Sequence, residues 1–351
     1  MGHNPSKKKN SVGKVKHPWE LLADDAILNV RLCDLKLKLK GSWLERPVEN
    51  LRGELADREL VLKPHIWLSD DWFCPDGTTG FAAPFFLAHP RLIKLERKHL
   101  LEAEGSNFPW CMKLLRHETG HVLQNAYQLH RRKKWRELFG KSSLPYPTTY
   151  RPRPLSKNYV LNLYNWYAQS HPAEDFAETF AVWLKPGRKW KTRYRGWPAI
   201  RKLEYVDELM AELMGVGPKK RSRAQVDPLS KLKKTLGEYF SEKQARYGTS
   251  HPDIYDRDLV RLFSNDSAHA SHETASAFLR RHRREIRRQV AKWTGEYAFT
   301  IDQVFNYMIG RSRELDLKMV GLEKEVRVDF AILLTVRTMQ YLHTRRERIP
   351  V

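Results

Sequence analysis

Cysteine is scarce in this sequence, with three residues in a chain of 351. Cys33, Cys74 and Cys111 lie far apart, and no two of them form a CxxC pair. This pattern disfavours both a disulfide framework and a zinc ribbon. We therefore expect three buried, reduced thiols and a cytoplasmic location.

Long apolar runs are also lacking. No stretch approaches the roughly 18 apolar residues that a membrane-spanning helix needs. The basic residues near the N-terminus are not followed by an apolar segment, so we expect no secretory signal. Residues 1–17 instead predict a disordered basic tail.

Acidic residues are few relative to basic ones, because 41 Asp and Glu stand against 63 Lys and Arg, a formal charge of +22. This excess favours acidic partners such as nucleic acid, an anionic surface or an acidic peptide, although solvated basic faces explain it equally well. The densest basic run, from Arg280 to Arg288, could contact phosphates of a polyanion or nucleic acid, or could be a solvated helix face.

Hydrophobic residues nevertheless make up 41% of the chain, enough for a sizeable core in two domains or in one domain with an extension. Apolar periodicity and turn residues predict an α+β order with few strands and many helices. Strands are expected at 35–40, 61–68 and 81–87, helices at 43–59, 92–104, 109–130, 159–185 and 201–214, a loop at 131–158, and nearly continuous helix from 228 onward.

The string His117-Glu118-Thr119-Gly120-His121 is an HExxH motif within an expected helix. Residues four apart share one helix face, so His117 and His121 can offer imidazole nitrogens to one tetrahedral zinc ion. Glu118 is rotated away from them and can take a proton from water beside the metal. The alternative is a pair of core histidines satisfied by hydrogen bonds.

A catalytic zinc needs a third protein ligand and one open position. Glu174 and Glu178 are four residues apart on a largely apolar expected helix, where two like charges make most sense near a cation. Glu174 is the favoured ligand, with His171 as its rival. Glu178 can then accept a hydrogen bond from the free nitrogen of a ligand histidine.

These two motifs resemble a bacterial family of zinc-binding metallopeptidases and, more broadly, the gluzincin type, in which HExxH is followed by ExxxE on a second helix. The resemblance covers about residues 20–215. It rests on Trp67–Asp70, Pro84–Leu92, Leu115–His121 and His171–Ala181.

The resemblance implies a mainly helical, zincin-like domain with a small N-terminal sheet, which we place at 18–220. Gly, Pro and charged residues cluster near 218–228 and predict a boundary there, followed by a basic helical region at 221–351 that the family motifs do not explain. The resemblance also implies bound Zn²⁺, a peptide or protein substrate, and a tyrosine near the oxyanion, which is Tyr167 here unless that ring only packs in the core. Gly80–Phe86 could pair with an extended substrate.

The expected function is therefore hydrolysis of peptide bonds by zinc-activated water with Glu118 as general base. The alternative is a basic binding or scaffold protein, possibly associated with nucleic acid, whose zinc site is structural or catalytically idle.

Overall fold

The computed structural model describes residues 17–350 except 101, 148, 151–152, 154–155, 165, 188, 248–254 and 345–348. The basic tail predicted at 1–17 lies, apart from His17, outside the described residues. The helices are α1 Asp24–Ile27, α2 Glu45–Ala56, α3 Pro90–Leu100, α4 Phe108–Tyr127, α5 Lys133–Phe139, α6 Pro172–Leu184, α7 Trp190–Arg193, α8 Ile200–Leu213, α9 Leu236–Tyr247, α10 Asp256–Leu262, α11 Ala275–Thr294, α12 Ala298–Glu314 and α13 Glu323–Thr344.

Strands are short and few, which confirms the mainly helical α+β class. Strands β1 His65–Ser69 and β2 Gly80–Pro84 pair in parallel, with Trp67 opposite Ala82. Two antiparallel pairs join β3 Thr149–Tyr150 to β6 Ile349–Pro350 and β4 Phe263–Ser264 to β5 Lys318–Met319.

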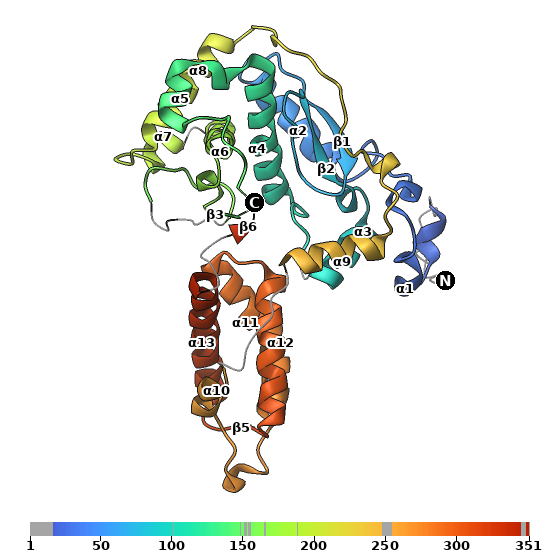
Figure 1. Cartoon of the computed structure of the whole chain (residues 1–351), viewed down its shortest axis with the longest axis vertical. Helices are drawn as coiled ribbons and strands as arrows, with labels where there is room; N and C mark the ends of the chain where they lie inside the picture. The colour runs from blue at the N-terminus through green and yellow to red at the C-terminus, as the bar shows by residue number, and fades with distance from the viewer. Residues whose placement is uncertain are drawn as a thin grey trace, which may run out of the picture.

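A first hydrophobic core surrounds α4, which runs through the middle of the larger body in Figure 1. Asn107 caps this helix by accepting a hydrogen bond from the Trp110 N–H, and Gln128 ends it in the left-handed conformation. Arg116 fastens α4 to α2 through two hydrogen bonds of 2.6 and 2.7 Å to the buried Glu54 carboxylate. The helix that carries HExxH is therefore held along its length.

Helices α10 to α13 surround a second hydrophobic core and form the elongated lower body of Figure 1. The arginine run on α11 is partly neutralised there, since Arg281 pairs with Glu273 and both Arg283 and Arg287 pair with Asp302. Phosphate contact by the rest of the run stays a prediction.

The first core reaches beyond residue 220, because Leu236, Tyr239 and Phe240 of α9 pack in it. Their aromatic rings contact residues of the N-terminal half, as in the Phe85–Tyr239 pair with centroids 5.1 Å apart. The predicted division into domains at 220 stays a prediction, and α9 is the element on which its position depends.

Three secondary-structure predictions are wrong. The alternation at 35–40 does not form a strand, because the 3-10 turn η2 Leu32–Leu35 ends there and Lys36 is left-handed with φ 48°. The helix predicted from 159 begins only at Pro172, after His171 caps it. The loop predicted at 131–158 contains α5, whose Trp135 and Phe139 are buried.

The cysteines were expected to be buried, reduced thiols, and the structure agrees with this expectation in part. Cys111 is buried, Cys33 and Cys74 are half-buried, and all three are free thiols. None of the described helices combines the length and the apolar character needed to cross a bilayer.

Candidate metal centre

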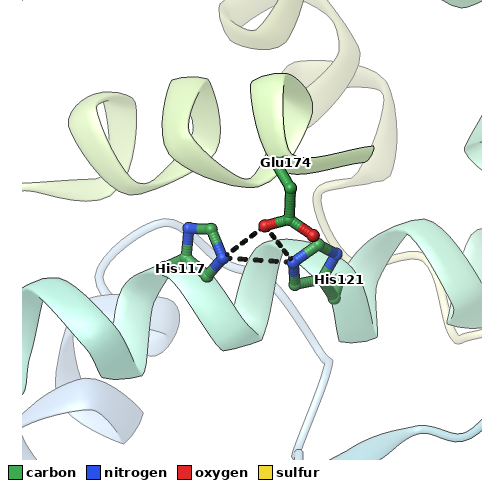
Figure 2. Close-up of side chains that lie close together, drawn as sticks. All are labelled: His117, His121 and Glu174. Atoms are coloured by element: carbon green, nitrogen blue, oxygen red, sulfur yellow. Dashed lines mark hydrogen bonds and ion pairs between the residues drawn. The ribbon is translucent and has the colours of Figure 1, made fainter. Parts of the chain in front are cut away.

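Two buried helices bring three potential metal ligands together (Figure 2). His117 and His121 project from one face of α4, with their Nε2 atoms 3.1 Å apart. Oε2 of Glu174, from the first turn of α6, lies 2.9 Å from Nε2 of His117 and 3.1 Å from Nε2 of His121. The three donor atoms form a nearly equilateral triangle and could hold a metal ion.

The dimensions of this triangle fit zinc. Bonds of about 2.0–2.1 Å in a tetrahedral site separate neighbouring ligand atoms by roughly 3.3 Å, close to the separations seen here. Two imidazoles and one carboxylate are also a usual donor set for catalytic zinc. Burial alone would raise the pKa of Glu174, but the two imidazoles hold it well below its usual range, so this carboxylate is ionised.

Glu178 orients the first histidine. Its Oε1 lies 2.8 Å from Nδ1 of His117, so this ring nitrogen donates its proton to the carboxylate, and Nε2 faces the other two ligand atoms. Asn162 Nδ2 and the Leu163 N–H also donate to Glu178, each at 2.8 Å. The carboxylate is thus held by three donors.

The remaining carboxylate of α6 has a separate partner. Asp175 is buried and accepts from Nζ of Lys202 at 2.6 Å, on the side of α6 that faces α8. Each of the three carboxylates of this largely apolar helix therefore has a polar partner. Glu174 and Glu178 contact the histidines of the metal centre, and Asp175 forms a buried ion pair with Lys202.

Gly120 permits the close crossing of α4 and α6. A Cβ atom at this position would lie 2.7 Å from Cα of Ala177, which is far inside van der Waals contact. Any side chain at position 120 would therefore push the two helices apart and separate Glu174 from the histidines.

Glu118 faces a cleft beside the ligands. One of its oxygens, Oε2, is buried and has no hydrogen-bond partner in the described part of the chain. Burial raises the pKa of Glu118 to about 7. The cleft has a volume of about 410 Å³, and His117, Tyr167 and Tyr297 are among the residues that line it.

The walls of this cleft come from both hydrophobic cores. Trp110 and Leu114 of α4 belong to the first body, whereas Arg288, Lys292 and Tyr297 come from α11 and the start of α12. Residues Gly80–Phe86, which were expected to pair with an extended substrate, do not line it. The cleft-lining strand residue is Tyr150 of β3.

Tyr167 lines the cleft, with its ring centroid 5.7 Å from that of His117, and its role near an oxyanion stays a prediction. Burial raises the pKa of Tyr167 well above its ordinary value, so its hydroxyl stays protonated and can donate. His171 lies apart from the ligand triangle: Nδ1 accepts from the Ala173 N–H and Nε2 lies 3.0 Å from the Leu144 carbonyl oxygen.

One contact to the centre was not predicted. The Tyr146 hydroxyl donates to Oε1 of Glu174 at 2.9 Å, while its ring stacks on His171 with centroids 4.0 Å apart. Tyr146 lies in a loop without periodicity, 28 residues before Glu174, so no sequence pattern linked the two.

The part of the chain that carries this geometry has a recognisable family signature. Residues 110–196 match the model of a family described as "Putative zinc-binding metallo-peptidase". This match includes both ligand-bearing helices and confirms the resemblance inferred from the sequence, while the gluzincin type stays a prediction. No curated protein and no solved structure matches the chain.

Proposed function

We propose that this protein is a zinc-dependent peptidase in which His117, His121 and Glu174 hold the ion and Glu118 is the general base. The observation that supports it most is that His117, one corner of the ligand triangle, lines the cleft next to Glu118, whose buried Oε2 has no hydrogen-bond partner among the described residues. A purely structural site has no use for such a group.

Zinc, when bound, supplies Lewis acidity that polarises an amide carbonyl and acidifies water. The chain supplies the proton transfers. Oε2 of Glu118 accepts a proton from the attacking water and returns it to the amine that leaves. Both transfers use the buried oxygen that has no hydrogen-bond partner among the described residues.

Two further residues would assist. Tyr167 would donate from its hydroxyl to the oxyanion of the tetrahedral intermediate. Glu178 would keep Nδ1 of His117 protonated, which fixes the ring with Nε2 toward the ion.

Metal analysis tests the ligand assignment. Purified wild-type chain should retain about one zinc per molecule, whereas His121→Ala and Glu174→Ala should lose most of it. His171→Ala is the matched control, because His171 caps α6 without facing the ligand triangle. If Glu174→Ala keeps its zinc while His171→Ala loses it, the third ligand is wrong.

Peptide hydrolysis tests the enzyme assignment. Zinc-loaded wild type and Glu118→Gln should be incubated with a peptide library derived from a digested proteome, and new termini identified by mass spectrometry. We expect cleavage by the wild type and a loss of at least about 100-fold in Glu118→Gln at unchanged zinc content. Zinc binding without any cleavage would support the idle-site alternative, and equal turnover by Glu118→Gln would exclude this residue as base.

A cytoplasmic location also stays a prediction.

A further inference from the structure

The cleft continues past Glu118 along the N-terminal half of α4. Leu114 and Trp110 lie four and eight residues before Glu118, so the three side chains share one helix face. Trp72, from the loop between β1 and β2, lines the same part of the cleft. This region therefore has apolar walls immediately beside the proposed general base.

Glu104 is placed against these walls by its neighbour. Gly105 is left-handed with φ +72°, and a Cβ there would lie 3.1 Å from Cδ1 of Leu114 and 3.2 Å from the Trp72 ring. The backbone thus comes close to both side chains, and Glu104 lines the cleft beside them. A larger residue at position 105 would prevent this approach.

Two neighbouring carboxylates that line the cleft, Asp71 and Glu102, already have polar partners. Asp71 lies 3.8 Å from the guanidinium of Arg246, and Glu102 accepts a hydrogen bond from the Ala298 N–H at 3.3 Å. Glu104 has neither an ion pair nor a hydrogen bond among the described residues. Burial, and then the charge of Asp71, raise the pKa of Glu104 to about 7, against an opposing effect from the charge of Lys243.

A carboxylate between apolar walls matches one kind of side chain. Lysine and arginine combine a long aliphatic stem, which can pack on Trp72, Trp110 and Leu114, with a cationic end that a carboxylate binds by charge-assisted hydrogen bonds. Acidic groups of a substrate would be drawn instead to Arg288 and Lys292, which α11 contributes to the same cleft.

We propose that Glu104 is a specificity-determining residue that binds a lysine or arginine side chain of the peptide substrate next to the scissile bond. This proposal rests on the proposed peptidase function, so it needs one test that uses catalysis and one that does not.

The first test compares cleavage sites in a proteome-derived peptide library. Zinc-loaded wild type should cut preferentially within two residues of Lys or Arg, and Glu104→Gln should lose roughly 10- to 100-fold in rate at those sites, the weight of a charge-assisted hydrogen bond. Glu104→Lys should shift the preference toward Asp or Glu. The control is Glu137→Gln, an exposed carboxylate on α5 outside the cleft. An unchanged cleavage profile in both Glu104 variants overturns the proposal.

The second test measures binding in zinc-loaded Glu118→Gln, with and without Glu104→Gln. The probes are three blocked hexapeptide pools with five randomised positions and either arginine, citrulline or glutamate fixed at the third. The immobilised protein should retain the arginine pool at least tenfold better than the citrulline pool, which has the same shape without the charge, and Glu104→Gln should abolish the difference. Equal retention of the two pools overturns the proposal. Selective retention without any cleavage by the wild type supports the binding of a cationic side chain by Glu104 and removes only the peptidase function.

Discussion

Removal of the Glu178 carboxylate should weaken zinc binding without removing any ligand. In Glu178→Ala, Nδ1 of His117 loses its acceptor at 2.8 Å, and the imidazole can rotate or exchange its tautomer. Loss of such a partner typically lowers metal affinity 10- to 100-fold, or about 1.4–2.7 kcal/mol. The donors of Asn162 and Leu163 lose the same acceptor, so the free energy of unfolding should fall by roughly 2–4 kcal/mol as well.

The assay is a competitive titration of zinc against a chromophoric chelator, with urea unfolding measured in parallel. Asp175→Asn is the matched control, because Asp175 is a buried carboxylate of the same helix whose partner is Lys202 rather than a histidine. This variant should lose roughly 1.5–3 kcal/mol of stability and keep its zinc affinity within threefold. If both variants lose affinity equally, the effect comes from general loosening of α6, and the orienting role of Glu178 is refuted.

Three further outcomes follow from the same contacts. Gly120→Ala should cost roughly 1–3 kcal/mol of stability and most of the zinc, because its Cβ would meet Ala177. Gly53→Ala, at an exposed position of α2 where a Cβ meets nothing, should be neutral or stabilising by roughly 0.5–1 kcal/mol. Thermal unfolding and metal analysis measure both variants, and equal behaviour would contradict the close-crossing argument. Zinc at one hundred times its dissociation constant should raise the free energy of unfolding by about 2.7 kcal/mol in the wild type but not in His121→Ala, as calorimetry with and without a chelator would show. Burial raises the pKa of Glu96 from 4.5 to about 7. The contribution of Glu96 to stability is therefore full below pH 4.5 and is lost as the pH rises through 7, by up to roughly 3 kcal/mol. Urea titrations from pH 5 to 8 should show this decline in the wild type and not in Glu96→Gln, and parallel curves for the two proteins would exclude Glu96 as its cause.

The closeness of the three candidate ligands could be predicted from the sequence because helical geometry is local. Four-residue spacing places His117 and His121 on one face whatever surrounds the helix, and Pro172 after His171 fixes where α6 begins. The choice between Glu174 and His171 depended on that start, because a capping residue turns its side chain back to the helix backbone.

The contacts that sequence reasoning missed are those between distant segments. Tyr146 reaches Glu174 from an irregular loop, where no periodicity predicts such a hydrogen bond. The alternating Leu and Lys residues at 35–40 look like a strand, but none of the described strands pairs with them, and Lys36 breaks the extended conformation. Periodicity identifies a face to be buried, whereas tertiary contacts decide what covers it.

The cleft is shared between two bodies, but the ligands are not. His117, His121 and Glu174 lie on α4 and α6, whose apolar residues pack in the first core. Arg288 lies on α11, whose apolar residues pack in the second core, and Tyr297 directly precedes α12. Substitutions at the junction between the bodies would therefore change the width of the cleft without altering the three candidate ligands. Under the proposed function, related chains built on the same two helices would differ in the polypeptides they admit while sharing one hydrolytic chemistry.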